Sequence, residues 1–256
     1  MILKRWFKGS IFILILIAFY IILQKPPVKQ YNINIIKEPH DLILVDDFAG
    51  FKGAYWNIVE QGNNYNNELQ YYKSDNILYK NGTLVITADK ENYKDYTYTS
   101  GLITTQGKFE FLYGKIIFKA KPAPGKGLLS AVWLLPKDGS LYPEIDIIEV
   151  LGEKPSEIWM GVHYLDNQQL KSNFQTFIQK DNSFAIYELH WEKNELRWYV
   201  NGELVHRNNK NSPHQEMYLL INLAIGGNWP KKPDDNIFPS SFLVDYIIII
   251  PENRTL

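Results

Sequence analysis

Short strand-like segments follow one another from Leu42 to Ile250, and turn residues separate them. The pairs Asn81-Gly82 and Asn201-Gly202 are typical of tight β-hairpin turns. No stretch of this region keeps an apolar period of 3.6 residues, so little helix is expected there. Many short strands in one chain predict an all-β fold, a two-sheet antiparallel β-sandwich (jelly roll) with a concave groove. Strands are expected at residues 42–45, 69–72, 77–79, 83–88, 102–105, 108–113, 114–120, 131–135, 144–149, 158–164, 184–191, 196–200, 203–206, 218–223 and 242–250.

The first 24 residues have a different character. Basic residues precede an apolar run at 11–23, in the order of an export signal, but no small-residue cleavage pair lies near the end of the run. Counted from Lys4 to Lys25, with snorkelling lysines, the segment spans ~32 Å as a helix, against a hydrocarbon core of ~30 Å. We therefore expect an N-terminal hydrophobic helix at 1–24 that acts as an uncleaved signal anchor, with a polar tether at 25–41. Secretion after cleavage is the alternative.

The folded domain is expected at 42–256, outside the cytoplasm and as a monomer. The formal net charge is -1, from 27 basic and 28 acidic residues, so no overall field attracts nucleic acid and none is expected as a partner. Cysteine is absent, which excludes disulfides and thiol nucleophiles. Aromatic residues make up 14% of the chain. That content fits a surface on which rings stack on sugars, although rings also pack the inside of a sandwich.

Three acids interrupt an apolar strand at residues 144–149. Because an unpaired buried carboxylate is costly, these acids are expected to face a cleft, bind a cation or form ion pairs. Strand alternation puts Glu144 and Asp146 on one face, and Glu149 joins them only if a β-bulge absorbs Ile147 or Ile148. Three carboxylates in one cleft would suit glycoside hydrolysis, in which one attacks the sugar and another donates a proton to the leaving oxygen.

Other blocks occur in order along the chain, at residues 66–72 (NNELQYY), 103–109 (ITTQGKF), 113–116 (YGKI), 161–164 (GVHY) and 222–230 (NLAIGGNWP). Together with the acids at 144–149, they resemble glycoside hydrolase family 16, in its laminarinase-like branch, over roughly residues 46–250. The resemblance implies a retaining, endo-acting hydrolase of internal β-1,3 or mixed β-1,3/1,4 glucan bonds. Glu144 would be the nucleophile, Glu149 the general acid and base, and Asp146 the assisting carboxylate, with no cofactor for catalysis.

The same resemblance implies further sites. Sugar contacts would come from Asn67, Trp133, His163, Asn222 and Trp229, although a core tryptophan and a structural histidine are the plain alternatives for Trp133 and His163. A structural calcium would be held by Asp47, the backbone of Gly82 and Asp245.

Two positions depart from the laminarinase-like pattern. Leu102 stands where many members have arginine, and Leu129 lies where a tryptophan-proline pair begins, so a charged donor and a ring are missing from the expected groove. The polymer therefore stays open, with agarose, carrageenan or xyloglucan as other substrates and wall-polysaccharide transglycosylation as another reaction. A catalytically silent carbohydrate-binding domain is the alternative from a different functional class.

Overall fold

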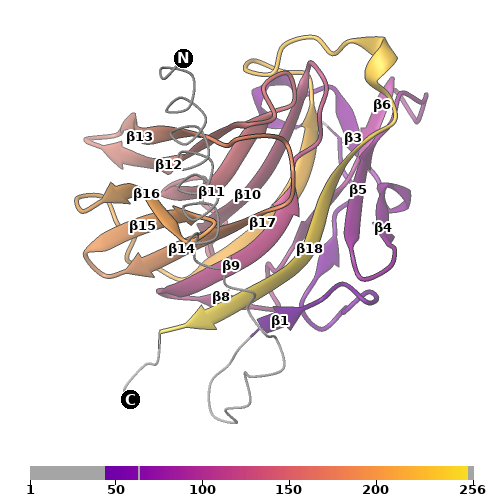
Figure 1. The fold of residues 1–256 in the computed structure, drawn as a ribbon. Helices are drawn as coiled ribbons and strands as arrows, with labels where there is room; N and C mark the ends of the chain where they lie inside the picture. The colour runs from indigo at the N-terminus through magenta and orange to yellow at the C-terminus, as the bar shows by residue number, and fades with distance from the viewer. Residues whose placement is uncertain (1–43, 63, 253–256) are drawn as a thin grey trace, which may run out of the picture. The chain divides into compact units, whose positions relative to one another are not determined.

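The structure is a computed structural model that describes residues 44–62 and 64–252. In this part of the chain, two antiparallel sheets stack face to face, with a small third sheet beside them (Figure 1). The two-sheet sandwich predicted from the strand pattern is thus confirmed. The expected anchor at 1–24 and tether at 25–41 lie outside the described residues. No helix within the described part has both the length and the apolar character needed to cross a bilayer.

Sheet A has the strand order β16-β15-β14-β9-β18-β5-β4, and β1 pairs with β18. Its strands are β1 (Leu44–Asp46), β4 (Ile77–Tyr79), β5 (Leu84–Ala88), β9 (Gly114–Lys121), β14 (Ala185–Glu192), β15 (Glu195–Val200), β16 (Glu203–Asn208) and β18 (Ser240–Pro251).

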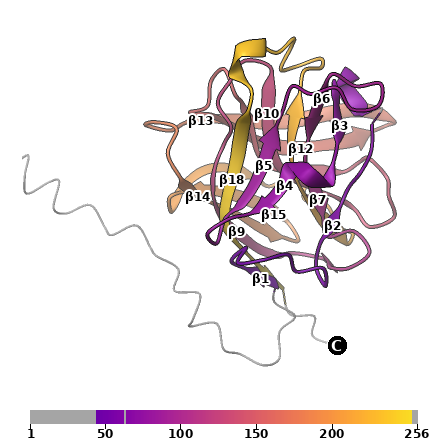
Figure 2. The same cartoon turned by 90° about the vertical axis from the view of Figure 1, so that its right-hand side faces the viewer.

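Sheet B has the order β13-β12-β11-β10-β17-β7-β2, and β8 pairs with β17. Its strands are β2 (Asn57–Ile58), β7 (Leu102–Thr104), β8 (Glu110–Phe111), β10 (Leu128–Pro136), β11 (Glu144–Leu151), β12 (Glu157–Asp166), β13 (Gln169–Ile178) and β17 (Met217–Ile225). A parallel pair, β3 (Gln70–Tyr72) and β6 (Tyr98–Ser100), forms the third sheet. Figure 2 shows this pair near β5 and β7, and β6 contacts both β5 and β17.

Along each strand of sheet B, alternate side chains point in opposite directions. One half of them packs in the core, and the other half lies on the face that points away from sheet A. On β10, Leu128, Val132 and Leu134 point inward and pack in the core between the two sheets. Each such fully buried side chain contributes ~1.5–3 kcal/mol of transfer free energy. The intervening residues, such as Trp133, point away from sheet A. We call this side of sheet B the outer face.

Four elements depart from the sequence expectations, and one of them is the two-residue β2, which was not predicted. β13 was not predicted, because its side chains are mostly exposed and carry no apolar alternation. β6 was not predicted either, and only Glu110–Phe111 of the expected strand at 108–113 forms a ladder, with β17. The only helical segments of the described residues are short 3-10 turns at Tyr65–Asn67, Ser74–Asn76 and Asp235–Ile237.

Candidate active site

A β-bulge in β11 brings the three acids to the outer face. Between Asp146 and Glu149, β11 contains one residue more than either neighbouring strand, and the pairing register shifts there. Ile147 and Ile148 both point into the core, where they are 1% and 0% exposed. Glu149 therefore returns to the face of Glu144 and Asp146, as the bulge hypothesis required. The pairs that define the bulge are Asp146 with Trp133 and Gly161, and Glu149 with Ala131 and Trp159.

Trp198, on β15 of sheet A, supports the bulge from the other side of the core. Its indole Nε1 donates a hydrogen bond of 2.9 Å to the backbone oxygen of Asp146. The side chain is 1% exposed, and its ring stacks on His206 with the centroids 4.7 Å apart. Because a bulge disrupts the strand ladder, backbone groups there need other partners. Trp198 supplies one and ties the acidic strand to sheet A.

Burial and mutual repulsion raise the pKa values of the three acids. Asp146 is 1% exposed, and burial, together with the charges of Glu144 and Glu149, raises its pKa well above the usual range. Burial also raises the pKa of Glu144, while a hydrogen bond with Asp146 opposes that rise. Asp146 is thus the proton donor to a Glu144 carboxylate. Burial, with help from the charges of Glu144 and Glu68, raises the pKa of Glu149 to about 8.

His163 lies next to these acids on β12, opposite Glu144. Its Nε2 is 3.9 Å from Asp146 Oδ2, a buried oxygen without a hydrogen-bond partner. On its other side, Nδ1 is 2.6 Å from the hydroxyl of Ser172 on β13. Phe174 packs against the imidazole, with the ring centroids 4.8 Å apart. Burial lowers the pKa of His163, so a neutral ring faces the acids.

Trp133 and Asn222 continue the site across β10 and β17. Trp133 pairs with Asp146 in the strand register, so its indole stands beside the acids on the outer face. Its Nε1 donates to Asn222 Oδ1 at 2.8 Å, and Asn222 Nδ2 in turn donates to the hydroxyl of Tyr72 at 2.9 Å. Trp133 is only partly buried, and it packs against the small apolar cluster that contains Tyr72 and Leu102 and not in the main core.

Asn67 and Trp229 lie on two loops that meet. Asn67 Nδ2 donates to Asn228 Oδ1 at 2.8 Å. Trp229 is 36% exposed, and its ring makes an edge contact with that of Trp159, with the centroids 5.5 Å apart. Because Trp159 is the β12 partner of Glu149, an exposed aromatic ring stands close to that end of the acid set.

The structure adds residues to which sequence reasoning assigned no role. Trp159 and Phe174 line the β12 and β13 side, Ser172 orients His163, and Glu68 lies near enough to Glu149 to raise its pKa. The sequence feature that could have pointed to Glu68 is its place in the block at 66–72, where it is the one acid among asparagine and glutamine side chains. Nothing in the exposed sequence of β13 pointed to Ser172 or Phe174.

The acids and His163 include side chains of the types that bind metal ions. One ligand atom each of Glu144, Asp146 and His163 falls within 4.8 Å of the others. The hydrogen bond between Glu144 and Asp146 already uses this proximity to share a proton, which needs no cation.

Both carboxylates among the positions expected to hold calcium form ion pairs with lysines. A side chain at Gly82 would come within 3.6 Å of the backbone oxygen of Asp47, so these two positions are neighbours. Oxygen donors of this kind suit calcium. However, the Asp47 carboxylate pairs with Lys52 at 3.1 Å, and that of Asp245 pairs with Lys119 at 2.6 Å. Each carboxylate therefore already has a cationic partner.

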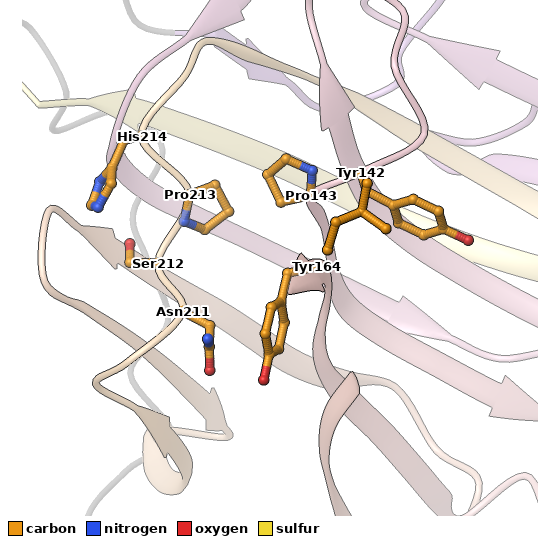
Figure 3. A pocket seen from close by; sticks show the side chains of 8 residues that line it. Tyr142, Pro143, Tyr164, Asn211, Ser212, Pro213 and His214 are labelled. Atoms are coloured by element: carbon orange, nitrogen blue, oxygen red, sulfur yellow. The ribbon is translucent and has the colours of Figure 1, made fainter. Parts of the chain in front are cut away.

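A cavity of about 270 Å³ opens beside the start of β11 (Figure 3). Tyr142 and Pro143 line one side, and Tyr164 and Asn211 face each other across the space. The ring of Tyr142 lies 6.4 Å from that of His163, so the cavity borders the acid set without including it. None of the residues expected to bind sugar lines it.

Comparison with known proteins places this geometry in a family. The model of glycosyl hydrolases family 16 matches residues 64–246. The glucan endo-1,3-beta-glucosidase A1 of Niallia circulans is 31% identical over 83% of this chain, and the beta-glucanase of Rhodothermus marinus is 30% identical over 82%. The chain spans 38% of the length of the first protein and 85% of the second. The laminarinase catalytic domain from Thermotoga maritima MSB8 superposes with a TM-score of 0.74 at 30% identity, over 82% of this chain and 98% of that one.

Proposed function

Because the chain belongs to glycosyl hydrolase family 16, we propose that it is an endo-acting, retaining hydrolase of internal β-1,3 or mixed β-1,3/1,4 glucan bonds. One observation carries the proposal: a single bulge gathers three interacting carboxylates on the outer face. The names of the relatives, which are β-1,3-glucanases and a laminarinase, support the substrate class.

In the first step, the Glu144 carboxylate attacks the anomeric carbon while the bond to the leaving oxygen breaks. Glu149 gives its proton to that oxygen, so the leaving sugar departs as a neutral alcohol. Asp146 keeps its own proton and donates a hydrogen bond to Glu144, which holds the nucleophile in position and limits the negative charge in the site to one.

In the second step, the ionised Glu149 takes a proton from water, and the resulting hydroxide attacks the anomeric carbon from the face that the leaving group left. The bond to Glu144 breaks, and the carboxylate is restored. Two displacements at one carbon give net retention. Every proton transfer uses groups of this chain, so the proposed reaction needs no cofactor.

The raised pKa of Glu149 predicts where activity falls on the alkaline side of the pH profile, which we call the basic limb. Glu149 works only while protonated, and its pKa is raised to about 8. Activity should therefore fall as the pH rises through about 8, because the acid then loses its proton. Initial rates on laminarin between pH 4 and pH 10, expressed as kcat/KM, measure this limb. A basic limb that persists in Glu149→Gln would show that another group sets it.

Trp198→Phe tests the support of the bulge. The variant leaves the backbone oxygen of Asp146 without its donor, which should cost ~1–3 kcal/mol of unfolding free energy. The kcat should also fall ~10–100-fold, since displacing a reacting group by ~1 Å can cost about 10²-fold. Trp191→Phe is the matched control, because Trp191 is also buried but donates to the backbone oxygen of Pro213. Equal losses of kcat in the two variants would contradict a specific role for Trp198.

Sugar binding is assigned to residues around the acids. Trp133 and Trp229 offer ring surfaces for stacking on pyranose faces, and Asn67, His163 and Asn222 offer polar contacts. With Asn67 and Trp133 on one side of β11 and His163 on the other, the polymer would cross the acidic strand.

The two leucines restrict one side of that path. Leu102 is 6% exposed and packs with Tyr72, Leu135 and Tyr218, and Leu129 packs with Leu151. Both are therefore closed apolar contacts on the outer face, with neither the hydrogen-bond fork of arginine nor the free surface of a ring.

The polymer itself is tested by digestion. Purified protein carrying residues 25–256 should release oligosaccharides of several lengths from laminarin or lichenan, as an endo-acting enzyme does. Agarose, carrageenan and xyloglucan in the same panel test the other polymers, and products longer than a starting oligosaccharide would reveal transglycosylation. Tight binding of laminarin with no product would instead support a silent carbohydrate-binding domain.

Calcium is expected to contribute little. A site saturated at a hundred times its Kd adds ~2.7 kcal/mol, or ~5–11 °C in Tm at ~2–4 °C per kcal/mol. Since Lys52 and Lys119 already pair with the candidate ligands, we expect less than ~2 °C between protein in EDTA and protein in millimolar calcium. Lys119→Met, which frees the carboxylate of Asp245, should respond more. A rise above ~5 °C in the unaltered protein would restore the calcium site.

We further propose that residues 1–24 anchor the enzyme to a membrane, with residues 42–256 outside the cytoplasm as a monomer. The order of basic and apolar residues in the sequence supports this arrangement. Fractionation of cells and N-terminal sequencing of the product would distinguish anchored protein from protein that is secreted after cleavage.

A further inference from the structure

Glu68 is a partly buried carboxylate held by neutral donors. Its Oε2 accepts hydrogen bonds from Gln70 Nε2 at 2.7 Å and from the Tyr72 hydroxyl at 3.3 Å. Gln70 is itself fixed, because its Oε1 accepts from the backbone N–H of Ile225 at 2.8 Å. Within residues 44–62 and 64–252, no lysine or arginine forms an ion pair with Glu68.

The loop that carries Glu68 is clamped to the loop after β17. The backbone N–H of Asn228 donates to Asn66 O at 2.7 Å, and that of Leu69 donates to Ile225 O at 2.8 Å. Gly227 makes this approach possible: its φ is +101°, and a side chain there would lie 2.8 Å from Asn66 O and 3.3 Å from Glu68 Cγ. Glu68 is therefore placed by tertiary contacts and cannot swing out without breaking them.

From Glu68, a chain of hydrogen bonds leads toward the proposed acid. Tyr72 bonds to Asn222 at 2.9 Å. In the strand registers, Asn222, Ala131 and Glu149 form one row across β17, β10 and β11. The outer two backbones are then ~10 Å apart, since neighbouring strands lie about 4.8 Å apart. Only the methyl group of Ala131 stands between Asn222 and Glu149 in this row.

We propose that Glu68 is a positioning residue for Glu149: its negative charge holds the proton on the acid until the leaving oxygen takes it. The inference rests on the proposed function. Glu68 acts through space and through the chain of Tyr72 and Asn222, and it does not touch the reacting atoms.

The charges around Glu149 favour this arrangement. Its own strand contributes Glu144 and the protonated Asp146, β12 contributes the neutral His163, and the segment at 68–72 contributes Glu68 and the hydroxyl of Tyr72. The residues of β10 and β17 in this row are uncharged. Burial raises the pKa of Glu68, while that of Glu149 is raised to about 8. A second anion on the same face therefore opposes ionisation of the acid.

Glu68→Gln tests the charge. The variant keeps the size and a possible acceptor for Tyr72 but removes the anion, so the basic limb of kcat/KM on laminarin should move to lower pH by ~0.5–1.5 units. Glu203→Gln, at an exposed position of β16, is the matched control and should leave the limb unchanged. Tyr72→Phe breaks the chain but keeps the charge of Glu68, so the limb should move less than it does in Glu68→Gln.

The outcomes separate this inference from the proposed function. If Glu68→Gln cleaves laminarin with an unmoved basic limb, the inference fails and the proposed function stands. If the unaltered protein cleaves no β-glucan, the proposed function fails. In that case, the pKa of Glu149 can still be compared between the unaltered protein and Glu68→Gln by ¹³C NMR titration of labelled glutamate carboxyls. An unchanged Glu149 titration in that experiment would overturn the inference as well.

Discussion

Glu144→Gln should abolish hydrolysis of laminarin and leave the protein folded. The amide cannot form the glycosyl ester, so kcat should fall ~10⁴–10⁶-fold, the scale on which removal of a covalent nucleophile acts. The substitution also removes a partly buried ionisable group next to Asp146, so the variant should be at least as stable at neutral pH. Reducing-end release and thermal unfolding measure the two effects.

The control for this variant is Glu203→Gln, which makes the same chemical change away from the site. It should retain full activity. If Glu144→Gln hydrolyses laminarin at the unaltered rate, the nucleophile is another residue. If it loses activity together with its cooperative unfolding transition, the loss reports the fold and leaves the nucleophile undecided, and Glu144→Asp then separates the cases by keeping the charge.

Glu149→Ala should lower the rate ~10²–10⁴-fold for natural glucans, the usual contribution of general acid help. Azide should rescue it with a substrate whose leaving group needs no proton, because azide attacks the glycosyl-enzyme without a general base. The product should then be the β-glycosyl azide. Glu144→Ala with azide should give the α-glycosyl azide instead, since azide takes the place of the missing nucleophile. The opposite stereochemistry in either variant would exchange the two assigned roles.

The acid set could be predicted from sequence because its constraints are local. Three acids among isoleucines must face away from a core, and the extra residue between Asp146 and Glu149 can reconcile them only through a bulge. The structure has that bulge, with Ile147 and Ile148 both in the core. The sandwich followed in the same way from apolar alternation and turn residues.

What could not be predicted depends on long-range contacts or on polar strands. β13 lacks apolar alternation, because most of its side chains are exposed, yet it places Ser172 and Phe174 against His163. Glu68 owes its place to contacts with a loop more than 150 positions later in the chain, which no local pattern reveals. Likewise, Lys119 becomes visible as the partner of Asp245 only once β9 and β18 are paired.

Because β11 can absorb an extra residue in a bulge, more than one sequence interval between Asp146 and the third acid gives the same arrangement of the three acids in space. Both neighbouring strands pass from the partner of Asp146 to that of Glu149 with one residue fewer than β11. Shortening β11 by one isoleucine would leave a regular ladder in which the three acids still share a face, because acids two positions apart point to the same side of a strand. A chain with a single residue between its second and third acids could therefore present the same constellation, and a search for such sites by fixed sequence interval would overlook it.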